Sequence, residues 1–195
     1  MKTKKKSIRK TSTAKRRSSK PPVRKRSAKS GKPAQAAVGA EFIRTARRHL
    51  MGEYLPKFHA CLDQLSDDDV WWRAHESDNS IGNLMLHLSG NMRQWIVAGL
   101  GGREFARDRD KEFSERRKIP KEELLDLFEK TVQDVDAVLG SFDPMRMTEV
   151  RHFQKWDYTC LYAIFHVVEH VSQHMGQIIY ITKLKKAIDL KLVDV

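Results

Sequence analysis

The chain contains the stretch His166-Val167-Val168-Glu169-His170-Val171-Ser172-Gln173-His174-Met175-Gly176-Gln177-Ile178, in which three histidines lie four residues apart among apolar side chains. In a helix of ~3.6 residues per turn, each step of four rotates the side chain by only ~40°, so the three imidazoles form one stripe. The surrounding segment, about residues 158–183, is apolar on most sides. This pattern predicts a long central helix, and the stripe is a candidate metal site because two histidines at i and i+4 can reach one ion.

Three further helices are predicted by apolar residues that recur at intervals of three and four. They cover about residues 40–65, interrupted at Pro56, residues 80–100, capped by Asn79 or Ser80 and stopped by Gly101-Gly102, and residues 118–139. The charged segment 103–118 is predicted to be a long loop, and 141–157 a connection with room for an extended stretch. No alternating strand pattern, glycine-rich phosphate loop or repeat competes with this interpretation. The predicted fold class is therefore all-α, a four-helix bundle.

The positive charge of the chain belongs to its first residues. The sequence has 195 residues and a formal net charge of +12, and residues 1–34 hold fifteen of its 37 Lys and Arg and no acid. The remaining chain has 22 basic and 25 acidic residues. We therefore expect a disordered tail over residues 1–37 and one helical domain over residues 38–195. Such a tail can contact nucleic acid nonspecifically through residues 1–34, and the alternative is a solvated extension without a role in the chemistry.

The cysteines and the apolar segments of the sequence indicate the cellular compartment in which the protein is expected. Cys61 and Cys160 are far apart and form no CxxC pattern, so neither a disulfide framework nor a thiolate zinc site is predicted. Residues 161–181 are long enough to cross a bilayer, but they include three histidines, Glu169 and two glutamines, which argues against a membrane span. The apolar core of a secretory signal is also missing from the tail. We expect a cytoplasmic protein that does not insert into membranes.

A usable metal site needs a ligand from a second helix. His87 is the best candidate, because it lies in an apolar run of the predicted second helix. His166 is the competing third ligand, but ligands at i, i+4 and i+8 spread over ~12 Å, so at most two of the row can bind one ion together. Glu169 and Gln177 are candidates for orienting the rings, although Glu169 can equally be a surface acid. The isolated histidines are expected to be surface or structural residues: His49, His59, His75 and His152.

Two segments resemble the DinB/YfiT-like superfamily of metalloenzymes. His170-Val-Ser-Gln-His174-Met-Gly-Gln177-Ile is similar to its last-helix signature, and Asn79-Ser80-Ile81-Gly82-Asn83-Leu84-Met85-Leu86-His87-Leu88 to its second-helix ligand segment. A bacterial branch also shares the stretch Arg107-Asp108-Arg109-Asp110-Lys111-Glu112-Phe113. The match covers about residues 38–185. It implies a four-helix bundle that holds a divalent metal through His87, His170 and His174 with open coordination positions.

Related members include thiol-dependent isomerases and transferases, such as mycothiol-dependent maleylpyruvate isomerase and bacillithiol transferase. Many members have a histidine and an arginine where this chain has Gln173 and Met175, so their thiol specificity does not carry over. The leading hypothesis is a metal-dependent enzyme, thiol-transferase-like or hydrolase-like, with Zn, Ni, Fe or Mn, a low-molecular-weight thiol as a candidate cofactor and an unknown small-molecule substrate. The alternatives are a non-enzymatic metal-stabilised bundle and a nucleic-acid-associated protein that acts through its tail. A homodimer is expected.

Overall fold

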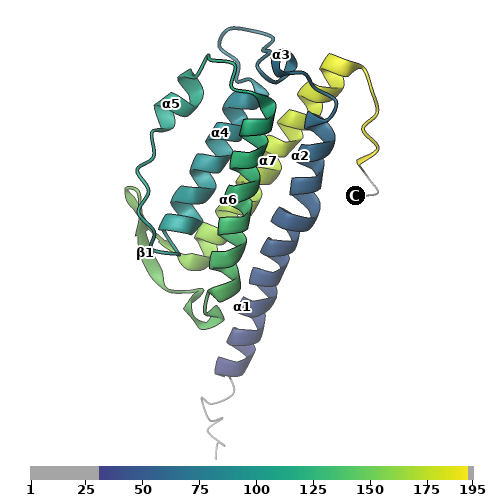
Figure 1. Cartoon of the computed structure of the whole chain (residues 1–195). Helices are drawn as coiled ribbons and strands as arrows, with labels where there is room; N and C mark the ends of the chain where they lie inside the picture. Colours follow the sequence, from purple (N-terminus) through teal and green to yellow (C-terminus); the bar gives the residue numbers. More distant parts are fainter. Residues whose placement is uncertain (1–30, 193–195) are drawn as a thin grey trace, which may run out of the picture.

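The computed structural model describes residues 31–192 and is helical over most of their length (Figure 1). The helical elements are α1 (Gly31–Arg47), the π-helical η2 (Arg48–Tyr54), α2 (Leu55–Leu62), α3 (Asp67–Val70), α4 (Ile81–Met92), the π-helical η3 (Arg93–Ala98), α5 (Arg109–Ser114), α6 (Lys121–Ser141), the 3-10 turn η4 (Pro144–Arg146) and α7 (Cys160–Lys186). Two strands, β1 (Val150–Phe153) and β2 (Trp156–Thr159), pair antiparallel.

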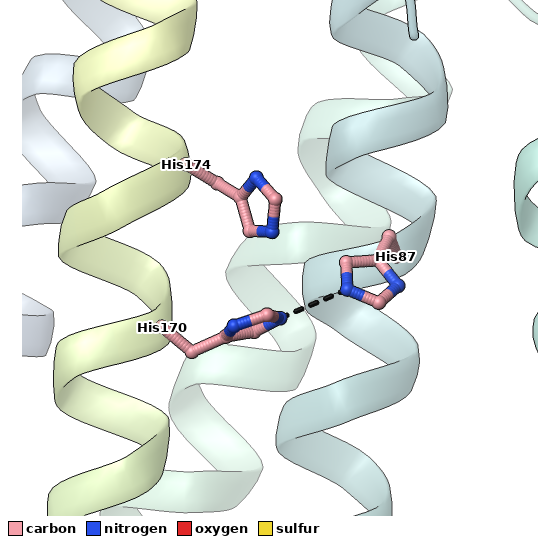
Figure 2. Close-up of side chains that lie close together, drawn as sticks. All are labelled: His87, His170 and His174. Atoms are coloured by element: carbon pink, nitrogen blue, oxygen red, sulfur yellow. Dashed lines mark hydrogen bonds between the residues drawn. The ribbon is translucent and has the colours of Figure 1, made fainter.

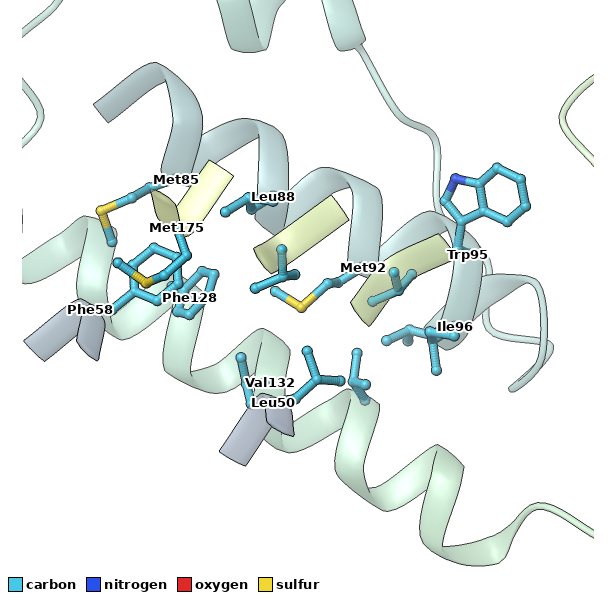
Figure 3. Close-up of a cluster of buried hydrophobic side chains, with 14 of the residues drawn as sticks. Leu50, Phe58, Met85, Leu88, Met92, Trp95, Ile96, Phe128, Val132 and Met175 are labelled. Carbon is cyan, nitrogen blue, oxygen red and sulfur yellow. The ribbon is translucent and has the colours of Figure 1, made fainter. Parts of the chain in front are cut away.

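The long helical segments α1–α2, α4, α6 and α7 run side by side and bury a shared apolar core (Figures 1 and 3). α4 packs against α6 and α7, and α2 packs against the same two helices. Phe58 of α2 and Phe128 of α6 meet with ring centroids 4.1 Å apart, and both side chains are almost fully buried. Burying such aromatic rings contributes a large part of the stabilisation of a core. The predicted apolar faces of the helices therefore point inward, and they hold α4 and α7 at a fixed separation.

The first long helix differs from its prediction at its N-terminus and at Pro56. It begins at Gly31, so residues 31–37, which the sequence assigns to a disordered tail, are helical instead. The other residues of the predicted tail, 1–30, lie outside the described residues. Pro56 does not break the helix: it occupies the first turn of α2, directly after η2, where the hydrogen bonds shift to the π pattern. A proline removes one backbone donor, and this local change of hydrogen bonding accommodates the loss.

Two connecting segments hold more structure than an all-α fold: the extended stretch expected within 141–157 is present as part of a hairpin, and the predicted loop 103–118 holds a short helix. The connection 141–157 contains the hairpin, whose register pairs Val150 with Thr159 and Phe153 with Trp156. Strands of four residues are too short to show an alternating pattern, and their turn uses Gln154 at φ 57°. The predicted loop 103–118 contains α5, capped by Asp108, whose side chain accepts from the backbone N–H of Lys111. The chain is therefore mostly helical with a small two-stranded sheet.

The start of α4 is held by its own capping residues and by the packing of Trp71 against it. Ser80 and Asn83 form a reciprocal capping box, which satisfies two backbone N–H groups at the helix N-terminus. Trp71 lies on Gly82, where a Cβ would meet the indole ring at 2.8 Å, and its Nε1 donates to the carbonyl of Ile119 at 2.8 Å. Trp71 is itself buried against the core. Among the described residues, no helix has the length and apolar character needed to cross a membrane.

Candidate metal centre

Three histidines from two helices converge between α4 and α7 (Figure 2). His87 lies in the second turn of α4 and is only 4% exposed, while His170 and His174 are half-buried on α7. One ring nitrogen of each lies within 4.8 Å of the others. The capped start of α4 and the long uninterrupted α7 set this convergence, because each ring is held by a rigid backbone rather than by a loop.

One pair of rings, His87 and His170, lies closer than two ligands of one ion. His87 Nε2 and His170 Nε2 are 2.8 Å apart, a hydrogen-bond distance at which one nitrogen carries a proton and the other accepts it. Ligand nitrogens of a tetrahedral site with bonds of ~2.1 Å are about 3.4 Å apart. Small side-chain rotations therefore suffice to exchange this hydrogen bond for coordination. The ring of His174 stands at 83° to His87 and 89° to His170, so the three donors approach from different directions.

A buried carboxylate orients the ring of His87. Glu112 Oε2 lies 3.0 Å from His87 Nδ1, and the glutamate side chain is 11% exposed. Arg107 Nη2 also lies 3.0 Å from that nitrogen, but arginine only donates, and it has the same glutamate oxygen at 2.8 Å. We therefore assign Nδ1–H of His87 as the donor to Glu112, which leaves the lone pair of Nε2 facing the other histidines. A carboxylate behind a ligating histidine is the usual second partner of such a ring.

Arg107 in turn holds Glu112. Its Nε donates to Glu112 Oε1 at 2.8 Å, and its Nη1 donates to Gln94 Oε1 at 3.0 Å. The carboxylate also needs room on α4: a Cβ at Gly90 would overlap Glu112 Oε1. Burial raises the pKa of Glu112, but the hydrogen bonds from Arg107 and His87 outweigh it, so its pKa is lowered overall and the carboxylate is charged at neutral pH.

Burial keeps the α7 histidines neutral. It lowers the pKa of His170 to about 3, with further lowering by the neighbouring His174 and His87. Burial also lowers the pKa of His174, although its hydrogen bond to Gln177 opposes the shift, and it lowers the pKa of His166. Neutral imidazole is the form that binds a metal ion, so these rings are ready to act as ligands at neutral pH.

The other predicted residues fall into two groups. Gln177 Oε1 lies 2.8 Å from His174 Nδ1, as expected for a residue that orients the ring, whereas Glu169 is exposed and has no hydrogen bond among the described residues. His166 stacks on His170 with centroids 5.3 Å apart, and its Nε2 lies 3.4 Å from Asn91 Nδ2, outside the cluster of three. The isolated histidines contact local polar partners away from the cluster: His49 with Glu53, His59 with Glu129, His75 with Ser77 and His152 with Asp157.

Arg107 and Glu112 are not among the predicted site residues, because the sequence places them in a loop. The signal that points to them is their position in the Arg107–Phe113 stretch that supports the family resemblance. The donor set itself fits a divalent transition metal, because it offers three imidazole nitrogens, and a carboxylate lies behind one of the rings.

Comparisons with known proteins identify a family and solved structures of similar fold. The family model of DUF1572, a protein of unknown function, matches residues 37–195. A DinB-like protein from Bacillus cereus has a similar structure, with a TM-score of 0.56, 16% identity and coverage of 69% of this chain and 87% of that one. A conserved protein from Enterococcus faecalis gives a TM-score of 0.55, 14% identity and coverage of 76% and 95%. No curated protein sequence matches the chain. The predicted DinB-like resemblance is confirmed at the level of the fold.

Proposed function

We propose that this chain, which belongs to the DUF1572 family, is a metal-dependent enzyme that holds a divalent transition-metal ion through His87, His170 and His174. One observation carries the proposal: three imidazole nitrogens from α4 and α7 lie within 4.8 Å of one another, and a buried carboxylate orients one of the rings. Zn, Ni, Fe and Mn all suit such a donor set.

A divalent ion held by three neutral imidazoles supplies Lewis acidity toward a thiol, a water molecule or a carbonyl oxygen. The chain's own residues supply the positioning. Glu112 and Gln177 fix the rings of His87 and His174 by hydrogen bonds of 3.0 and 2.8 Å. This arrangement supports thiol-transferase-like or hydrolase-like chemistry on a small molecule, with a low-molecular-weight thiol as the candidate cofactor.

We also propose that α1–α2, α4, α6 and α7 form the four-helix bundle expected from the sequence, because they run side by side around one core (Figure 1). In such a bundle, ligands on facing helices meet at a site inside the frame. The homodimer, the cytoplasmic location and the nucleic-acid contact through residues 1–34 stay predictions.

Elemental analysis of protein purified without a histidine tag tests the proposal. We expect about one equivalent of a divalent transition metal in the wild type and its loss in His87→Ala, His170→Ala and His174→Ala. His166→Ala is the matched control, because it removes a ring from the same stripe of α7 but outside the cluster, and it should keep the metal. Stoichiometric metal in both the His87 and His174 variants would refute the assignment.

The same cluster also supports a purely structural metal. His87 and His170 link α4 to α7, two helices that lie far apart in the sequence, so an ion there would hold them together. In that case chelation lowers the melting temperature, and no turnover appears across a panel of thiols and hydrolysable esters. Metal-dependent turnover that is lost in His174→Ala would exclude this alternative.

A further inference from the structure

A cavity of about 390 Å³ opens beside the histidine cluster. It is lined by Gln177, Tyr180 and Leu184 of α7 and by Trp72 and Arg73 of the connection between α3 and α4. Leu84, which also lines it, precedes His87 by three residues, and Gln177 follows His174 by three. The cavity is therefore about one helical turn from the cluster along both helices, and its volume suits a small molecule.

Arg73 brings a positive charge that lacks a strong partner. Its side chain is 12% exposed, and its ion pair with Glu76 spans 3.9 Å to a carboxylate that is 84% exposed. Among the described residues, its one hydrogen bond runs from Nη2 to Asn83 Oδ1 at 3.2 Å, and its buried Nε has no partner. A guanidinium has five N–H donors, so most of them remain available. Asp78 also lines the cavity, but its Oδ2 already accepts from the backbone N–H of His75 at 3.0 Å.

Two of the α7 side chains that line the cavity offer large apolar surfaces to solvent. Tyr180 is 69% exposed and Leu184 is 57% exposed, although both line the cavity. Trp72 lines the same cavity, with Lys185 Nζ 4.8 Å from the centroid of its ring. A ligand that lies between these side chains would bury apolar surface, and its charged end would meet the under-used guanidinium.

We propose that this cavity binds a small organic carboxylate with an apolar body, whose carboxylate pairs with Arg73 and whose body packs between Trp72 and Tyr180. Gln177 links the cavity to the cluster, because it lines the cavity and contacts His174 Nδ1. The assignment of this ligand as the substrate rests on the proposed metal-dependent function. The binding of the carboxylate in the cavity is independent of that function.

Phenylacetate is the probe, and phenylacetamide is its neutral match in shape. By titration calorimetry, we expect phenylacetate to bind the wild type at least tenfold more tightly than phenylacetamide does. Arg73→Gln should weaken phenylacetate binding at least tenfold, while Arg44→Gln, which removes an exposed charge on α1, should leave it unchanged. Equal binding of the two probes, or wild-type affinity in Arg73→Gln, would overturn the proposal.

A second variant covers the case in which Arg73→Gln fails to fold. Ala74 is exposed and lines the cavity, so Ala74→Trp should fill the space without disturbing the core and should also abolish phenylacetate binding. Unchanged binding in that variant would place the ligand elsewhere and refute the site.

Metal content separates this proposal from the proposed function. We expect Arg73→Gln to keep the wild-type metal content and His174→Ala to keep phenylacetate binding while it loses the metal. In protein loaded with Co²⁺, the proton NMR lines of phenylacetate should broaden relative to protein loaded with Zn²⁺, because the cavity adjoins the cluster. Binding without such broadening would contradict the substrate assignment, and wild-type protein without metal would contradict the proposed function alone.

Discussion

Glu112 is the residue on which the orientation of His87 depends. Its Oε1 accepts from Arg107 Nε, and its Oε2 accepts from Arg107 Nη2 and from His87 Nδ1. The carboxylate can point only one way, because the guanidinium holds both oxygens and Gly90 leaves space for it. His87 is thereby kept in the tautomer whose Nε2 carries no proton, so that its lone pair accepts from His170 or can bind a metal ion.

Replacing Glu112 with Gln should therefore weaken metal binding without removing it. The amide keeps the shape but loses the charge, and its NH₂ group can face His87 Nδ1 and favour the wrong tautomer. Loss of such a partner typically lowers metal affinity about 10- to 100-fold. Zn²⁺ titration against a competing chelator measures the effect, with Asp110→Asn, an exposed acid on α5, as the control. Wild-type affinity in Glu112→Gln would show that the carboxylate has no such role.

The sequence predicts the three histidines and Gln177 beside His174, but not Glu112, the partner of His87. Spacing of four on one helix places His170 and His174 on one face, and an apolar run places His87 inward, so local pattern is sufficient. The contact between His87 and Glu112 spans 25 residues and depends on the path of the 103–118 segment. No local periodicity fixes that path.

Among the elements, α3 shows how a four-residue helix is tied to the end of α7. Asp69 accepts from the backbone N–H and hydroxyl of Ser66 in a capping box, and its carboxylate pairs with Lys186 at 2.6 Å and Lys185 at 3.4 Å. The hydrogen bond from Lys186 is the largest cause that holds the pKa of Asp69 well below its usual value, and burial opposes it. This carboxylate joins the segment that leads to the cavity to the helix that carries two of the histidines.

Asp69 should therefore make the stability depend on pH in the acid range. Its pKa is lowered by folding, so its contribution is complete above the unfolded value of ~3.9 and is lost as the pH falls below it. We expect Asp69→Asn to be less stable than the wild type by roughly 1 kcal/mol at pH 7 and the difference to shrink below about pH 4. Urea unfolding at several pH values measures this, with Asp68→Asn, an exposed acid, as the control. A difference that does not change with pH would contradict it.

The long helices are the elements that sequence pattern predicts best, since each has several turns of apolar residues facing one core. The short elements are predicted less well for physical reasons: α5 is missed, and an extended stretch is expected in 141–157 but not its pairing into a hairpin. α5 and the strands of the hairpin have six or fewer residues, and their formation depends on contacts such as Phe153 stacked on Trp95 at 5.1 Å. The N-terminus of α4 can be predicted in part, because Ser80 is recognisable as a helix cap from its residue type and position.

For the whole molecule, the described fold places polar side chains along the seam between two helices that otherwise bury apolar residues. His87 and Asn91 of α4 face His170 and His166 of α7, and the buried Oδ1 of Asn91 has no hydrogen-bond partner among the described residues. Burying a polar group such as this Oδ1 without a partner is costly, and the mutual hydrogen bond of His87 and His170 offsets only part of the cost along the seam. A ligand that satisfies the three imidazoles should therefore stabilise the whole fold.

Thermal unfolding with and without metal tests this linkage. With free Zn²⁺ at ~100 times its dissociation constant, binding to the folded state alone adds about 2.7 kcal/mol. For a chain of this size, that corresponds to a rise in Tm of about 5 to 10 °C. The rise should disappear on adding a chelator and in His170→Ala, whereas His166→Ala should respond like the wild type, because its ring lies outside the cluster. An equal Tm for the metal-loaded and chelated wild type would mean that the imidazoles between α4 and α7 are satisfied without an ion.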